Sequence, residues 1–255
     1  MKTRLYPAAA SSTLFPAAPD YVEVLTPAQR ENLVYSPSAS DAVTTIANRL
    51  SSLSLPARAI LFGEPGIGKS ATLRNLAVGS LRPFWSVKSD QLFSAFLGGT
   101  ASNLSNLFVA AGKANAVLVF DDFDAIARRR DDPRESGESR RVVTTLLSAM
   151  DETRSSTAVL AATNLPDVID PAVVRRFEFL VPFGRLDRTR IKELLQLVLN
   201  QEVVAKSILS AAEGFSPAEI VEMAATLRLR NGALADLEVM LKQRKDAIQR
   251  MRGRS

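Results

Sequence analysis

Cysteine and histidine are both absent from the 255 residues of this chain. Without cysteine there can be no disulfide framework and no thiolate metal site. Without histidine, no imidazole can serve as an acid, a base or a metal ligand, so carboxylates, lysine, arginine and asparagine must carry any catalysis. The sequence also has no apolar run long enough to cross a bilayer, and we therefore expect no membrane span.

The composition is typical of a globular intracellular enzyme, with 46% hydrophobic and 23% charged residues, and we expect a cytoplasmic location. Residues 1–38 are interrupted by Pro7, Pro16 and Pro19 and lack a continuous apolar stretch, which makes them a poor secretory signal. We expect these residues to form an extended N-terminal arm, followed by a first helix at residues 40–53.

A phosphate-binding pattern, G-x-x-x-x-G-K-S/T, is present without a gap. Its residues are Gly63, Glu64, Pro65, Gly66, Ile67, Gly68, Lys69 and Ser70, and Ala71 follows. Glycines allow a loop to wrap a phosphate with its N–H groups pointing inward, and the next helix adds its positive N-terminal end. Lys69 would neutralise the β- and γ-phosphates, and the Ser70 hydroxyl would hold Mg²⁺. The sequence therefore predicts a nucleoside triphosphate site.

Acidic side chains follow a second apolar run, residues 116–120. Ligands of doubly wound sheets bind at the carboxyl ends of the strands, which is where these acids lie. Asp121 is placed to hold the Mg²⁺ shell, and Asp122 to orient or deprotonate the attacking water. The alternative is an acidic loop that caps a helix starting at Ala125. A phosphate loop in the same chain favours the catalytic interpretation.

The order of apolar and helical segments predicts the fold. Apolar strands are expected at residues 59–62, 83–87, 116–120, 157–162 and 178–182, and helices at 187–199, 202–212, 216–229 and 233–250. Strands that alternate with helices indicate a parallel sheet. We expect an α/β fold with a five-stranded parallel sheet flanked by helices at 39–185, and a small all-α lid at 186–255. Ser216 and Glu219 form a capping box in the lid.

Together these motifs resemble the AAA+ ATPases, and more narrowly the AAA family proper in its single-module, protein-remodelling form. The motifs that carry the resemblance lie, in the family's order, at residues 63–70, 120–126, 161–164, 170–177 and 214–219. The resemblance implies a P-loop NTPase fold, ATP and Mg²⁺ as ligands, and Mg²⁺-dependent ATP hydrolysis. It extends over nearly the whole chain, from about residue 40 to residue 250.

The resemblance also implies roles for three side chains outside the phosphate loop and the aspartates. Asn164 matches the polar sensor that reads the γ-phosphate, although an Asx turn is the alternative for this residue alone. Arg175 and Arg176 match the paired arginines that one subunit extends into the nucleotide site of its neighbour. For two arginines at a helix end, the alternative is a solvated C-terminal cap.

Two loops match the family's pore loops. The first contains Phe96, Leu97 and Gly98, an aromatic and an aliphatic residue followed by glycine, and such loops grip an extended polypeptide in the family. A core stripe formed by Phe93, Phe96 and Leu97 is the alternative. The polar segment at residues 131–138 matches the position of the second pore loop.

One residue departs from the family's pattern. Most members have Asp-Glu at the end of the third strand, whereas this chain has Asp121 and Asp122, so the predicted base is shorter by about 1.5 Å. A catalytic base must lie within about 2.6–3.2 Å of its proton or act through another water. We therefore expect ATP binding with slow but real hydrolysis.

The net charge of +5 and the pI near 9.7 keep nucleic acid open as a partner, although no aromatic stacking platform supports it. We expect a homo-oligomer, a hexameric ring that threads or remodels a protein or peptide substrate. Target selection would rest on the arm or on a separate adaptor. The alternatives are a nucleic-acid motor or loader, and an ATP-gated assembly scaffold with weak hydrolysis.

Overall fold

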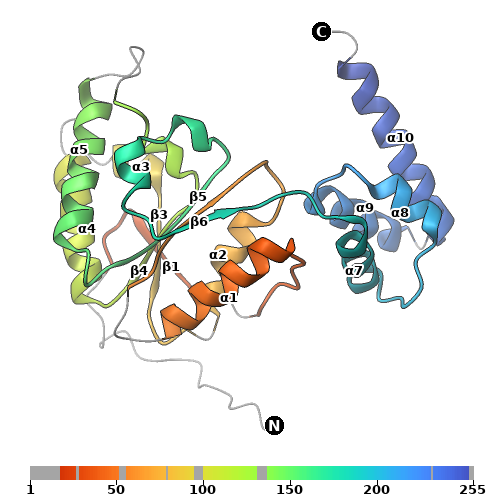
Figure 1. Ribbon diagram of the computed structural model, residues 1–255, viewed down its shortest axis with the longest axis horizontal. Helices are drawn as coiled ribbons and strands as arrows, with labels where there is room; N and C mark the ends of the chain where they lie inside the picture. Colours follow the sequence, from red (N-terminus) through yellow and green to blue (C-terminus); the bar gives the residue numbers. More distant parts are fainter. Residues whose placement is uncertain are drawn as a thin grey trace.

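The computed structural model describes residues 18–26, 29–51, 56–78, 80–94, 100–130, 137–230 and 232–252. The strands are β1 (Val22–Leu25), β2 (Arg58–Phe62), β3 (Phe84–Val87), β4 (Val117–Phe120), β5 (Ala158–Thr163) and β6 (Phe179–Pro182). The helices of the same lobe are α1 (Pro37–Ser51), α2 (Lys69–Ala77), α3 (Ser89–Ser94), α4 (Thr100–Lys113), α5 (Gly137–Glu152) and α6 (Pro171–Val174), with 3₁₀ turns η1 (Phe123–Ala125) and η2 (Pro166–Val168). The second lobe contains α7 (Arg188–Leu199), α8 (Lys206–Ala212), α9 (Pro217–Leu229) and α10 (Leu234–Arg252). Figure 1 shows the α/β lobe and this helical lid at opposite ends of the molecule.

The sheet has six strands in the order β1-β3-β4-β5-β2-β6. The five predicted strands are all present and pair in parallel, so the α/β fold with a parallel sheet is confirmed. The predicted number of strands is corrected from five to six, because β1 pairs antiparallel with β3. This strand is four residues long and lies at a sheet edge with Glu23 and Val24 exposed, so it has no strong apolar pattern.

The same pairing places a strand within residues 1–38, which the sequence predicts as an extended arm. Residues 22–25 belong to the sheet, and α1 begins at Pro37 rather than at Ser40. An antiparallel edge strand on a parallel sheet is common in large α/β folds. The described part of the predicted arm is therefore part of the ATPase lobe.

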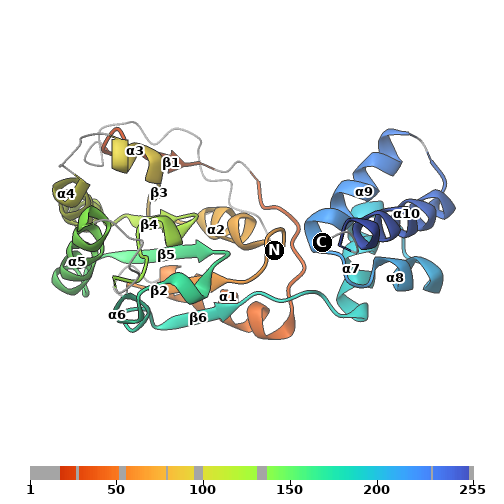
Figure 2. The same cartoon turned by 90° about the horizontal axis from the view of Figure 1, so that it is seen from above.

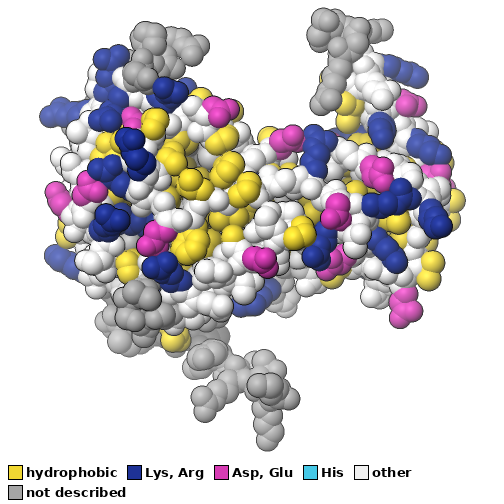
Figure 3. All heavy atoms as spheres, viewed as in Figure 1, with side chains coloured by type: hydrophobic (Ala, Val, Ile, Leu, Met, Phe, Trp, Pro, Cys, Tyr) yellow, Lys and Arg dark blue, Asp and Glu magenta, His cyan; other side chains and the backbone are white. Residues whose placement is uncertain are grey.

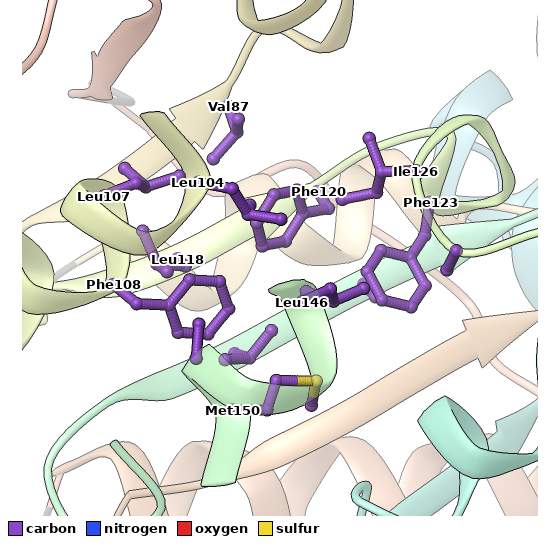
Figure 4. Close-up of a cluster of buried hydrophobic side chains, with 14 of the residues drawn as sticks. Val87, Leu104, Leu107, Phe108, Leu118, Phe120, Phe123, Ile126, Leu146 and Met150 are labelled. Atoms are coloured by element: carbon purple, nitrogen blue, oxygen red, sulfur yellow. The ribbon is translucent and has the colours of Figure 1, made fainter. Parts of the chain in front are cut away.

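Each face of the sheet packs against its own pair of helices. Along β4, Val117 and Val119 contact the α1 and α2 side, whereas Leu118 and Phe120 contact the α4 and α5 side. This alternation follows from the two-residue period of a strand, and because both faces are covered the strand is apolar throughout. Figure 4 shows the second of these clusters, in which Phe108 of α4 and Leu146 of α5 lie beside Phe120.

The lid has a core of its own. Its buried side chains include Leu195 of α7, Ile220 and Met223 of α9, and Leu241 of α10. The four predicted lid helices are present, although α8 begins at Lys206 rather than at residue 202. No helix in the ranges given above is both long and apolar enough to cross a membrane.

The predicted pore loops lie largely outside the described residues. Phe96, Leu97 and Gly98 are among the residues that the structure leaves undescribed, and so are residues 131–136. Their roles therefore stay predictions from the sequence.

The capping box at the start of α9 gives a first test of the fold. The Ser216 hydroxyl accepts the N–H of Glu219 at 3.3 Å, and the Glu219 carboxylate accepts the N–H of Ser216 at 2.9 Å. We expect Ser216→Ala to lower the free energy of unfolding by about 1 kcal/mol, which lowers Tm by roughly 2–4 °C. Thermal unfolding followed by circular dichroism measures this. Ser210→Ala, an exposed change on α8, is the control, and equal Tm values for the two variants would contradict the capping role.

Candidate active site

The carboxyl ends of three neighbouring strands converge on one edge of the sheet. The glycine-rich loop follows β2, Asp121 follows β4 and Asn164 follows β5. Because β5 lies between β4 and β2, Asn164 comes between the loop and the aspartates. Ligands of open parallel sheets bind at this edge. The strand order alone therefore assembles the residues that the sequence singles out.

The glycine-rich loop needs backbone geometry that other residues rarely adopt. Gly63 has a φ of 142°, and a Cβ atom there would lie 2.2 Å from the carbonyl oxygen of Phe183. Gly68 has a φ of 99° and is the N-terminal cap residue of α2. The first N–H groups of α2 have no intrahelical acceptor and carry the positive end of the helix dipole. The loop and the helix start can thus receive a phosphate.

Lys69 is the central cation of the site. Its Nζ donates to the carbonyl oxygens of Gly63 at 2.8 Å and Glu64 at 2.7 Å, and to Asn164 Oδ1 at 2.7 Å. The residue is 6% exposed, and burial lowers the pKa of its ammonium group although Asp121 and Asp122 oppose that shift. The ammonium is thus held in place by three neutral oxygens.

Ser70 and Asp121 form a pair of oxygen ligands beside Lys69. The Ser70 hydroxyl donates to Asp121 Oδ1 at 3.0 Å. Hydroxyl and carboxylate oxygens are the ligand types that suit Mg²⁺, which usually binds through one or two protein groups together with substrate phosphates. Within the described residues no group of three or more carboxylates forms an all-protein metal site.

Asp122 lies beside Asp121 in an environment that makes its carboxyl group more basic. Its backbone is left-handed, with φ 62° and ψ 51°. Partial burial raises the pKa of its carboxyl group, as do the neighbouring charges of Asp121 and Asp124, and Lys69 opposes them. A raised pKa makes a carboxylate a stronger proton acceptor near neutral pH. Asp124 has another role, because it accepts the Thr163 hydroxyl at 2.7 Å at the end of β5.

These residues border a cleft of about 570 Å³, a volume within the usual range for a ligand site. It is lined by the phosphate-loop residues Pro65 to Ala71 and by Asp121, Asp122 and Asn164. Residues 31–35 form one wall, and Leu194, Pro217, Ala218, Val221 and Glu222 of the lid contribute to another. In Figure 2, the chain that leads into α1 passes along the side of the α/β lobe that faces the lid.

The wall at residues 31–35 is a part of the site that the sequence did not reveal. Asn75 of α2 holds it as a clamp: its Oδ1 accepts the N–H of Glu31 at 2.8 Å, and its Nδ2 donates to the carbonyl of Glu31 at 2.7 Å. The Glu31 carboxylate also pairs with Arg74 at 2.9 Å. No sequence motif predicts these contacts, because they join the side chain of Asn75 to the backbone of a residue 44 positions away. The apolar run of residues 33–35 was the one local signal.

The lid is tied directly to the phosphate loop. Ala218 at the start of α9 donates its N–H to the carbonyl of Gly66 at 3.0 Å. Arg185, just before α7, pairs with Glu64 of the loop at 2.6 Å and also donates to the carbonyl of Gly214. The position of the lid and that of the loop are therefore coupled by two sets of polar contacts.

The two predicted arginines lie away from this cleft. Arg175 is exposed at the end of α6, and its side chain has no ion pair with the residues that the structure describes. Arg176 instead pairs with Asp151 of α5 in the same chain, through Nε at 2.8 Å and Nη2 at 2.6 Å. Neither arginine borders the cleft of its own chain.

A phosphate loop, paired aspartates and an asparagine at the ends of adjacent parallel strands are the arrangement typical of a P-loop nucleoside triphosphatase. Residues 59–185 match the family described as "ATPase family associated with various cellular activities (AAA)". The chain belongs to the AAA+ superfamily, and membership implies nucleotide binding with ATP as the nucleotide.

Similar proteins agree with this assignment. The chain is 35% identical over 216 residues to "Uncharacterized AAA family ATPase y4kL" of Sinorhizobium fredii, covering 80% of this chain and 66% of the relative. It is 42% identical over 140 residues to "Nuclear valosin-containing protein-like" of Mus musculus, and this alignment covers 54% of this chain and 15% of the relative. It is 32% identical over 201 residues to "ATP-dependent zinc metalloprotease FtsH 3" of Sphaerobacter thermophilus, and this alignment covers 72% of this chain and 41% of the relative. The chain thus spans less than two thirds of the length of each of these relatives.

A solved structure supports the fold. The Escherichia coli MS115-1 complex of HORMA, CdnC and Trip13 contains a chain that aligns with a TM-score of 0.71 at 18% identity, covering 83% of this chain and 88% of the other.

The Asn75 clamp leads to a prediction about nucleotide affinity. Asn75→Ala removes two hydrogen bonds to the wall at residue 31, and we expect Kd for ATP to rise about fivefold, equivalent to about 1 kcal/mol. Isothermal titration calorimetry with ATP and Mg²⁺ measures the change. Asn48→Ala, an exposed change on α1, should leave Kd unaltered. An unchanged Kd for Asn75→Ala would show that the clamp does not shape the site.

Proposed function

We propose that this protein is a Mg²⁺-dependent ATPase that works as a ring-shaped oligomer and remodels protein substrates. The observation that carries the proposal is the contact of Lys69 with both the phosphate loop and Asn164, beside the Ser70 and Asp121 pair. Phosphoryl transfer requires positioning and charge stabilisation more than covalent chemistry, and this cluster contains the groups that supply both.

Each residue has a definite part in this proposal. The N–H groups of the loop and the Lys69 ammonium bind and neutralise the phosphates, and Lys69 exchanges carbonyl oxygens for phosphate oxygens as it does so. Ser70 and Asp121 would hold Mg²⁺, which spreads the charge that develops on the transferred phosphoryl group. Asp122 orients the attacking water and accepts its proton, and Asn164 fixes the position of that water.

The oligomer is supported by the location of the arginines and by the surface. Arg175 is exposed and lies outside its own cleft, so it can act on the nucleotide only in a neighbouring subunit. Figure 3 shows hydrophobic side chains gathered on the α/β lobe around the place where β5 and β6 lie in Figure 1. Leu165, which follows β5, and Leu180, which lies on β6, are each about half exposed. An exposed apolar area of this kind favours a subunit interface.

A protein substrate is favoured over nucleic acid by the relatives and by the charges. The name of one relative, an ATP-dependent metalloprotease, describes action on proteins. Lysine and arginine side chains are interspersed with acidic ones on the face shown in Figure 3, whereas a surface that binds nucleic acid would gather charge of one sign.

Stimulation of ATP turnover by an unfolded polypeptide would support a protein substrate. Stimulation by single-stranded nucleic acid with a steep salt dependence would favour the alternative.

The short side chain of Asp122 leads to a prediction about rate. Asp122→Glu moves the carboxylate about 1.5 Å closer to the water, so we expect kcat to rise several-fold with ATP affinity unchanged. Asp122→Asn, which cannot accept a proton, should reduce kcat at least about a hundredfold. Steady-state phosphate release measures both variants, and a lower kcat for Asp122→Glu with normal binding would contradict the role of this residue.

The shared site leads to a prediction about concentration. We expect turnover per chain to rise cooperatively with protein concentration, and to fall by roughly 10³-fold or more when Arg175 and Arg176 are both changed to alanine. Phosphate release against protein concentration, with sedimentation velocity in parallel, measures this. The control is Lys113→Ala, an exposed cation on α4. ATP binding and oligomer formation without turnover in any sample would instead indicate an ATP-gated scaffold.

A further inference from the structure

The short helix α6, which precedes the two arginines, is fixed at three points. At its start, Asp170 caps the helix by accepting the N–H of Ala172 at 2.8 Å, and the same carboxylate pairs with Arg130 at 2.8 Å. Burial would raise the pKa of Asp170, but the bonds from Arg130 and Ala172 outweigh it and the pKa is lowered. The Asp170 side chain is therefore an ionised, nearly buried anchor.

The second point is aromatic. Phe177, directly after the arginines, packs edge-on against Phe123 with ring centroids 5.5 Å apart. Phe123 is fully buried and contacts Phe120 of β4, with centroids 5.6 Å apart. Aromatic pairs of this geometry stabilise beyond their buried area. Phe177 therefore anchors the end of the segment to the core of the sheet.

The third point is Arg176. Its guanidinium binds both carboxylate oxygens of Asp151 and donates through Nη1 to the carbonyl of Ala172 at 2.7 Å. Such a two-point pairing with a carboxylate is the arrangement that gives arginine its geometric specificity. The bond from Arg176 holds the pKa of the Asp151 carboxyl below its usual range, and the same contact raises the pKa of Arg176. Three of the five donor hydrogens of this guanidinium are already used within the chain.

We propose that the two adjacent arginines have different roles: Arg175 alone acts on the neighbour's nucleotide, and Arg176 is a positioning residue that clasps α6 to α5 through Asp151. This inference rests on the proposed function, because it assigns separate roles to the two arginines of the shared nucleotide site. A group that stabilises charge in a transition state must be held in place beforehand. The clasp, the cap and the aromatic contact supply that rigidity and leave Arg175 exposed at the tip.

The opposite arrangement is a latch, in which Asp151 holds Arg176 back until a neighbour arrives. The two arrangements differ in the effect of Asp151→Asn, which weakens the pair and keeps the shape of the side chain. If Arg176 is a clasp, releasing it loosens α6 and lowers turnover. If Arg176 is a latched finger, releasing it leaves turnover unchanged or raises it.

Thermal unfolding without nucleotide tests the clasp independently of catalysis. We expect Arg176→Ala and Asp151→Asn each to lower Tm by roughly 2–4 °C, with the double variant no lower than either alone. Arg175→Ala should leave Tm unchanged, as should the control Lys113→Ala. Additive losses in the double variant would overturn the clasp. These readings hold even if the protein does not hydrolyse ATP, which would count against the proposed function alone.

Steady-state turnover at a concentration that saturates assembly completes the test. We expect Arg175→Ala to lose roughly 10³-fold in kcat, whereas Arg176→Ala and Asp151→Asn share a smaller loss of about tenfold. The exchanged pair, Asp151→Arg with Arg176→Asp, should recover most of the turnover and the Tm, because it rebuilds the ion pair with the charges reversed. An aspartate at position 176 cannot stabilise a neighbour's phosphate. A loss of about 10³-fold in Arg176→Ala, or normal turnover in Asp151→Asn, would overturn the proposal.

Discussion

The parallel pairing of β4, β5 and β2 is the constraint on which the site depends. Parallel neighbours bring their carboxyl ends to one edge, so three loops far apart in the sequence meet without a dedicated scaffold. Thr163 lies opposite Phe62 in the register, and Gly63 donates its N–H to the carbonyl of Thr163 at 3.3 Å. A shift of one residue in this pairing would turn inward-facing side chains to the other face and separate Asn164 from Lys69.

The buried charge of Lys69 explains why these loops are joined to one another. An ammonium group taken out of water must find oxygen partners or lose its proton. Here the partners are two loop carbonyls and Asn164, so the cation itself draws the phosphate loop and the end of β5 together. Phosphate oxygens would offer the same ammonium charged acceptors in place of these neutral ones.

The sequence predicts those parts of this structure that depend on local patterns. Apolar runs predict the five parallel strands because both faces of the sheet are covered, and the glycine-rich loop predicts the phosphate site because its backbone geometry demands glycine. The edge strand β1 and the Asn75 clamp on Glu31 depend on long-range backbone pairing, which leaves no periodic signal. The partner of Arg176 is similarly hidden, since nothing near residue 176 points to Asp151.

The aromatic contact between Phe123 and Phe177 joins the segment that carries the aspartates to the segment that carries the arginines. Phe123 comes directly after the aspartates of the chain's own cleft, and Phe177 comes two residues after Arg175, which is proposed to serve the cleft of the next subunit. Both rings are buried in a core that is packed too densely to absorb a displacement without a matching one. Loss of the Phe123 ring would therefore remove a packing partner of Phe177 and weaken the support of the segment that carries Arg175.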